Sequence, residues 1–87
     1  METFSSLREQ LELLEWPDVY LFKFIMPNEQ ENIAKITAFF DENASINLHP
    51  SGRGNYTSLS IKAVMFTVDD IITIYKKASA INGVISL

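Results

Sequence analysis

Apolar and polar residues alternate strictly along residues 44–49 and for the most part along residues 55–66. This period of two is typical of strands that bury one face. A third stretch, residues 19–26, is apolar on both faces apart from Lys23, as expected for a central strand. The short run Val-Ile-Ser-Leu at residues 84–87 predicts a fourth strand.

Leucines recur at helical spacing near the N-terminus and predict a first helix over residues 6–15. Ser6, with Glu9 three residues later, is a capping-box pattern. The predicted apolar stripe of this helix consists of Leu7, Leu11 and Leu14. We expect this stripe to pack on the body of the domain, and the alternative is an arm that binds a partner.

Two further helices are predicted over residues 29–42 and 68–80, each after a residue that can cap a helix. Asn28 precedes the first, and Thr67 precedes the second with Asp70 three residues later. The residues expected to be buried are Ile33, Ile36, Phe39 and Phe40 in one helix and Val68, Ile71, Ile72, Tyr75 and Ala78 in the other.

The predicted order is strand–helix–strand–strand–helix–strand, preceded by one helix. Two right-handed β-α-β units around a central hairpin give an α+β, ferredoxin-like βαββαβ sandwich. Its four-stranded antiparallel sheet has the expected spatial order fourth, first, third, second, with two helices on one face. We expect one domain over residues 1–87, with residues 1–16 as an N-terminal helical extension.

The other face of the sheet has no predicted helix over it. We place on it the polar residues Lys23, Ser45, Asn47, His49, Tyr56, Ser58, Ser60, Lys62 and Ser86, interleaved with Val19, Leu21, Ile25, Val64 and Phe66. A face with this much apolar area tends to be covered, here by the first helix or by a second subunit. RNA-recognition domains use the same face, but Asn55 and Thr57 stand where they place aromatic residues.

The amino-acid composition narrows the range of partners, cofactors and reactions that we expect. Seven Lys and Arg against eleven Asp and Glu give a net charge of −4, which disfavours nucleic acid as a partner. The chain has no cysteine and a single histidine, His49, so we expect no disulfide, no metal site, no cofactor and no catalytic triad. No signal-peptide pattern and no apolar stretch of about 20 residues occurs, so we expect a cytoplasmic protein without a membrane anchor.

The turn between the second and third strands carries the most distinctive residues. Gly52 and Gly54 flank Arg53, and either glycine can supply a positive φ. Arg53 and neighbouring backbone N–H groups could receive an anion, and the alternative is a tight hairpin with a solvated arginine. The glycine-rich signatures of phosphate-binding loops are absent.

The hairpin sequence Pro-Ser-Gly-Arg-Gly-Asn-Tyr-Thr-Ser-Leu-Ser-Ile, residues 50–61, resembles the signature of the YbeD-like family of small bacterial proteins. Residues 11–17, Leu-Glu-Leu-Leu-Glu-Trp-Pro, are similar to the lead-in of that family. The resemblance implies a ferredoxin-like fold related to amino-acid-sensing ACT domains, in a family whose biochemical role is not established. The loop at residues 26–29 lacks the glycine of a typical ACT effector site and the arginine of acylphosphatases.

We therefore predict a non-enzymatic regulatory or protein-interaction module that binds a protein partner or self-associates. One alternative is a sensor of a small amino-acid-like or anionic metabolite, and the weakest is RNA binding through the helix-free sheet face. The residues predicted to bind the ligand or partner are Ser51, Arg53, Gly54, Asn55, Tyr56, Ser58, Lys62, Lys23 and His49.

Overall fold

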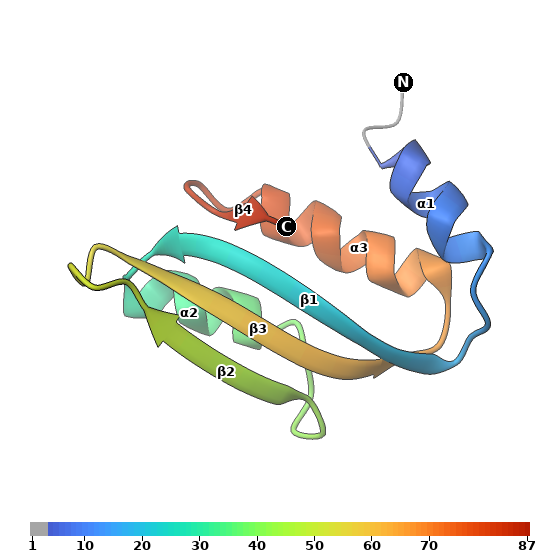
Figure 1. Ribbon diagram of the computed structural model, residues 1–87, viewed down its shortest axis with the longest axis horizontal. Coiled ribbons are helices and arrows are strands. Elements are labelled where there is room, and N and C mark those ends of the chain that lie inside the picture. Colours follow the sequence, from blue (N-terminus) through green and yellow to red (C-terminus); the bar gives the residue numbers. More distant parts are fainter. Residues whose placement is uncertain (1–3) are drawn as a thin grey trace.

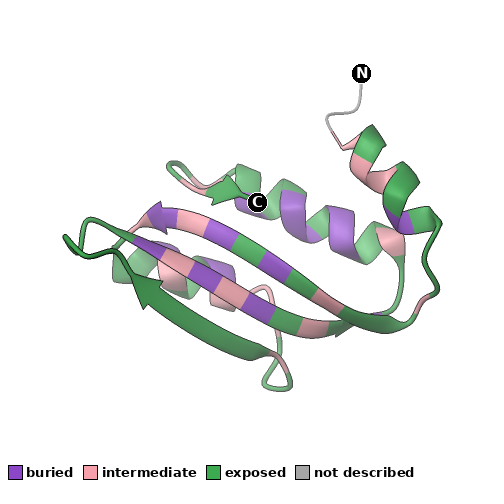
Figure 2. Cartoon of the chain, viewed as in Figure 1, coloured by how far each residue is buried: buried purple, intermediate pink, exposed green. Residues whose placement is uncertain are grey.

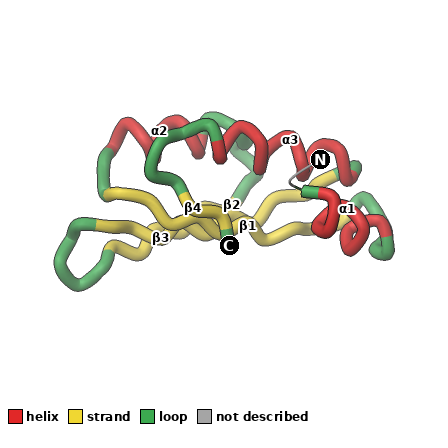
Figure 3. Tube along the Cα trace, turned by 90° about the horizontal axis from the view of Figure 1, so that it is seen from above, coloured by secondary structure: helices red, strands yellow, loops and turns green. Residues whose placement is uncertain are grey.

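The computed structural model describes residues 4–87, so residues 1–3 of the predicted extension lie outside the described part (Figure 1). The elements are α1 (Ser5–Glu12), β1 (Asp18–Pro27), α2 (Gln30–Thr37), β2 (Ser45–Pro50), β3 (Tyr56–Met65), α3 (Val68–Ser79) and β4 (Ile85–Ser86). The strands form one antiparallel sheet in the order β2-β3-β1-β4. Figure 3 shows α2 and α3 on one side of this sheet. The α+β, ferredoxin-like arrangement with an extra helix is confirmed.

The two central strands, β1 and β3, pair along ten residues each. Their helix-facing residues alternate with residues on the other face, and Figure 2 shows this as alternating burial along both ribbons. The fully buried apolar side chains of this sheet face are Phe22, Phe24, Met26, Leu59 and Ile61. The period of two in the sequence therefore assigned the faces of the central strands correctly.

Helix α3 supplies the largest helical part of the core. Thr67 caps it, because its Oγ1 accepts a hydrogen bond of 3.1 Å from the backbone N–H of Asp70. Tyr75 lies at its centre, and the Tyr75 hydroxyl is 2.8 Å from that of Tyr20 on β1. Burial, together with this hydrogen bond, raises the pKa of Tyr75 far above its usual range. The buried residues of α3 are Ile71, Ile72, Ile74, Tyr75 and Ala78; Ile74 was not predicted, and Val68 is only half-buried.

Helix α1 packs on the body of the domain, which confirms the expectation for its apolar stripe. Leu11 is 3% exposed, Arg8 Nη1 lies 2.6 Å from Asp69 Oδ1 on α3, and Trp16 Nε1 donates to the carbonyl of Leu11 at 2.9 Å. The helix ends at Glu12 rather than residue 15, so Leu14 leaves the stripe and is exposed. The predicted capping box is also wrong, since α1 begins after Phe4 without a side-chain cap.

Helix α2 is shorter than its apolar pattern predicts and ends at Thr37 rather than residue 42. Its N-cap position is Glu29, without a side-chain cap, so the prediction that Asn28 caps this helix is wrong. Asn28 instead donates its backbone N–H and its side-chain amide to the β2–β3 hairpin. Phe39 and Phe40, which follow the helix, still pack against the core as half-buried residues.

Both edges of the sheet correct the sequence-based assignment of side chains. The alternation of residues 44–49 predicts that Ile46 and Leu48 point inward. They pair with the helix-facing Ile61 and Leu59, yet they are exposed, because β2 is the outer strand and lies beyond the covered part of the sheet (Figure 2). Ser86 pairs with Phe24 and so belongs to the helix-facing side rather than the other face.

Candidate functional site

The β2–β3 hairpin is built by its own backbone hydrogen bonds. Gly54 N donates to the carbonyl of Ser51 at 2.9 Å, and Ser51 N donates to the carbonyl of Tyr56 at 2.8 Å. Of the two hairpin glycines, only Gly54 has a positive φ, +73°, so Gly52 is not needed to reverse the chain. Because the N–H of Gly54 is already bonded within the turn, it is not free to bind an anion.

Asn28 fastens the hairpin to the start of α2. Its backbone N–H donates to the carbonyl of Asn55 at 3.0 Å, and its Nδ2 donates to the carbonyl of Gly54 at 3.1 Å. Arg53 is exposed, and it lines neither of the two principal cavities among residues 4–87. The two hydrogen bonds of Asn28 therefore hold the hairpin against the loop between β1 and α2.

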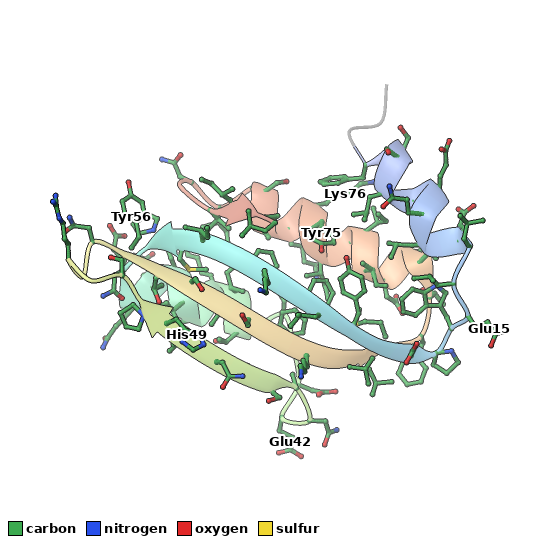
Figure 4. The ribbon with its side chains drawn as sticks, viewed as in Figure 1. Glu15, Glu42, His49, Tyr56, Tyr75 and Lys76 are labelled. Atoms are coloured by element: carbon green, nitrogen blue, oxygen red, sulfur yellow. The ribbon has the colours of Figure 1, made fainter. Side chains whose placement is uncertain are left out.

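The predicted site residues do not come together in one place. The hairpin holds Ser51, Arg53, Gly54, Asn55 and Tyr56, whereas Lys23, His49, Ser58 and Lys62 lie along the sheet. His49 pairs with Ser58, but Lys62 lies four residues further along β3, about 13 Å away. Figure 4 shows the labelled His49 on β2 well separated from Tyr56 at the hairpin.

A different feature unites the helix-free side of the sheet, here called the open sheet face. It consists of Val19, Leu21, Lys23, Ile25, Ser58, Ser60, Lys62, Val64 and Phe66 with Ile85 of β4 and Ser45, Asn47 and His49 of β2. Val19 pairs directly with Val64 and is 57% exposed, and Phe66 is 66% exposed. Helix α1 does not cover this face, because its contacts are with α3.

The charges of the open sheet face oppose those of the whole chain. Lys23 and Lys62 are exposed on it, on adjacent strands, and Lys62 lies two residues along β3 from Ser60, the partner of Lys23. No carboxylate occurs among the described residues that make up this face, although the chain carries eleven Asp and Glu and a net charge of −4. The face is therefore apolar and basic on an acidic protein.

The end of α1 combines exposed apolar side chains with acidic ones, and we call residues 12–15 the Leu-Glu corner. Leu13 is 85% exposed and Leu14 is 57% exposed, with Glu12 and Glu15 on either side of them. Figure 4 shows Glu15 at the end of the molecule where β1 begins. The same end of the sheet carries the Val19–Val64 pair. An apolar, acidic surface thus lies beside an apolar, basic one.

A groove of about 610 Å³ lies between α3 and the α2–β2 loop, at the end of β3 that is remote from the hairpin. We call it the α3 groove. It is lined by Phe39, Phe40, Asp41, Asn43, Ala44, Ala63, Val64, Met65, Phe66, Asp70, Thr73, Ile74 and Lys77. The groove is not predictable from the sequence, because it depends on α2 ending at Thr37 and on the path of the following loop. A more polar cavity of about 550 Å³ lies between the start of α2 and the α3–β4 turn.

Residues 4–87 contain no group of three or more His, Cys, Asp or Glu that could hold a metal ion. His49 is exposed on β2. The hydroxyl of Thr57 is buried without a hydrogen-bond partner, in the part of β3 that faces the helices. In the same described part of the chain, no helix is both long and apolar enough to cross a membrane.

The sequence of the chain is similar to those of known proteins. A family model described as a protein of unknown function (DUF493) matches residues 11–87. A UPF0250 protein of Haemophilus ducreyi is 29% identical over 77 residues, which cover 84% of this chain and 79% of the relative. Neither description names an activity, a ligand or a partner.

Proposed function

From the surface of this chain, which belongs to the DUF493 family of proteins of unknown function, we propose that it is a non-enzymatic interaction module that self-associates through the open sheet face. YbeD belongs to the same family, so the resemblance drawn from the hairpin is confirmed. The proposal rests on one observation, which is the uncovered apolar and basic face of the sheet.

The exposed apolar side chains supply the driving force for this association. Val19, Val64 and Phe66 are each more than half exposed and lie at one end of the face. Burying one such side chain completely is worth roughly 1.5–3 kcal/mol. Contiguous apolar area of this kind marks surfaces at which proteins interact.

A second copy of the chain is the occupant that we propose, because the Leu-Glu corner carries the complementary chemistry. Leu13 and Leu14 can be buried against the apolar part of the face, and the carboxylates of Glu12 and Glu15 can pair with Lys23 and Lys62. Corner and face lie at the same end of each molecule. In a dimer with two-fold symmetry, the Leu-Glu corner of each copy can then pack on the open sheet face of the other copy.

Analytical ultracentrifugation over a range of concentrations tests the association. We expect a monomer–dimer equilibrium whose Kd rises at least tenfold in Phe66→Ser, which corresponds to about 1.4 kcal/mol. The matched control is Ile46→Thr, an exposed apolar residue on β2 that points to the helix side, and it should leave Kd unchanged. A strict monomer up to millimolar concentration, or an equal effect of both variants, contradicts the proposal.

Exchanging the charges of the proposed ion pair tests whether the Leu-Glu corner of a second copy occupies the open sheet face. Lys62→Glu and Glu15→Lys should each weaken the dimer by about fivefold, as expected for a partly exposed ion pair of about 1 kcal/mol. The double variant restores the pair and should recover most of the lost affinity. Lys35→Glu on α2 makes the same change in net charge away from the face and should have no effect. If the loss of dimer affinity in the double variant equals the product of the losses in the two single variants, the Leu-Glu corner is not the occupant.

A further inference from the structure

We infer that the α3 groove is a binding site for a small molecule that joins an apolar, ring-sized body to a cationic amine. The groove is formed by α3, the α2–β2 loop and the end of β3, and it shares Val64 and Phe66 with the open sheet face. It also moves the sensor alternative away from the hairpin to the opposite end of β3.

The size and lining of the groove fit a small organic ligand. Its volume of about 610 Å³ lies within the range of sites that bind small molecules, which are concave and mostly apolar with a few polar groups. Met65 and Ile74 are each only 7% exposed and contribute to the wall from β3 and α3. Phe40 is half-buried and fixed by an edge contact with Phe22, with ring centroids 5.1 Å apart.

The wall formed by the α2–β2 loop is ordered by its own hydrogen bonds. Phe39 N and Phe40 N donate to carbonyls of the last turn of α2 at 3.0 and 3.1 Å. Asp41 accepts twice, from Asn43 N at its Oδ1 and from Ala44 N at its carbonyl, at 2.9 and 3.2 Å. A wall that is already formed reduces the entropy lost when a ligand binds.

Three charged residues line the groove, and their balance favours a cation. Asp41 and Asp70 are exposed, and neither takes part in an ion pair among residues 4–87. Lys77 places its Nζ 5.6 Å from the centre of the Phe39 ring, in a cation–π contact. An ammonium group on the ligand can therefore pair with one of two available carboxylates, whereas an anion would meet both of them.

The probes are 2-phenylethylamine and 3-phenylpropionate, which share an aromatic ring but differ in charge. Titration into the full-length ¹⁵N-labelled chain, followed by amide chemical shifts, should show saturable binding of the amine. The shifts should lie in residues 39–44, 63–66 and 70–77, and the amine should bind at least tenfold more tightly than the carboxylate. Equal affinities, shifts centred elsewhere, or no saturable binding of the amine overturns the proposal.

Substitutions that keep side-chain shape test the role of charge. Asp41→Asn with Asp70→Asn should weaken amine binding about tenfold and bring its affinity close to that of the carboxylate probe. Glu42→Gln is the matched control, because Glu42 is exposed in the same loop and does not line the groove (Figure 4). An equal loss of amine affinity in Glu42→Gln would show that the aspartates act only through the long-range effect of net charge. That result would overturn the proposed site.

A third variant tests the position of the apolar body. Ala63 lines the groove from the helix side of β3 and is half-buried, so Ala63→Leu places three further carbon atoms in it. It should abolish binding of the amine while the amide spectrum stays that of a folded chain. Unchanged amine affinity in folded Ala63→Leu contradicts the site, and the aspartate variants decide the question if this variant does not fold.

Discussion

At the scale of single residues, the two glycines of the hairpin play different parts. Gly54 adopts a φ of +73° and carries the turn, whereas Gly52 has no positive φ and no heavy atom within 4 Å of an added Cβ. The sequence does not distinguish the two glycines, since both flank Arg53 and both can reverse a chain. The distinction depends on which residue enters the left-handed region, which several turn types allow at either position.

Gly54→Ala should lower the free energy of unfolding by about 1–2 kcal/mol, because an alanine is strained in the left-handed region. Gly52→Ala should be neutral or stabilise by up to about 1 kcal/mol, since it restricts the unfolded chain without strain in the folded one. Urea unfolding of both variants measures the difference. Equal effects would mean that the turn does not depend on Gly54.

At the scale of elements, prediction succeeded where local chemistry decides and failed where distant contacts do. Thr67 caps α3 because its hydroxyl bonds a neighbour three residues away, so the pattern was sufficient. Asn28 looked equally suitable, but its amide bonds Gly54, a residue 26 positions away. The early ends of α1 and α2 are likewise not visible in the periodicity of their leucines and phenylalanines.

Leu11 is the only buried residue of α1. Leu11→Ala should cost about 2–3 kcal/mol, because it removes a buried leucine and leaves a cavity. Leu13→Ala, two residues away and 85% exposed, should change stability by less than about 0.5 kcal/mol. Urea unfolding gives both values, and hydrogen exchange of residues 5–12 should accelerate only in Leu11→Ala. Unaltered exchange in that variant would show that α1 is held by other contacts.

At the scale of the whole molecule, the central strands and their faces were predictable and the surface sites were not. The side chains predicted on the open face of β1 and β3 lie there, whereas Ile46 and Leu48 of β2 are exposed and Ser86 of β4 belongs to the helix-facing side. The α3 groove and the Leu-Glu corner depend on where helices stop in space. No local pattern in the sequence encodes that information.

Tyr75 couples the core to pH, because its ring on α3 packs against Tyr20, Phe22 and Phe24 of β1 and against Phe4, which precedes α1. Its raised pKa means that the folded state retains a proton that the unfolded state loses near pH 10. The associated stability is present below about pH 10 and is lost as pH rises above it.

The urea midpoint should therefore fall between pH 9 and 11 more steeply in the wild type than in Tyr75→Phe. At neutral pH the variant should lose about 0.5–1.5 kcal/mol with the Tyr20 hydrogen bond. Tyr56→Phe, at an exposed position of the hairpin, is the control and should keep the wild-type slope. Parallel pH profiles for wild type and Tyr75→Phe would assign the alkaline loss to other groups.

The hydrogen bond from the indole of Trp16 to the carbonyl of Leu11 has a spectroscopic consequence. Trp16 is the only tryptophan in the chain, and it sits where α1 joins β1, half-buried and 6.3 Å from the ring of Tyr20. Its fluorescence therefore reports on the docking of α1, whereas far-ultraviolet circular dichroism reports on all helices and strands. If α1 detaches before the sheet unfolds, the fluorescence transition precedes the dichroism transition, and coincident curves mean that the helix and the sheet unfold as one cooperative unit.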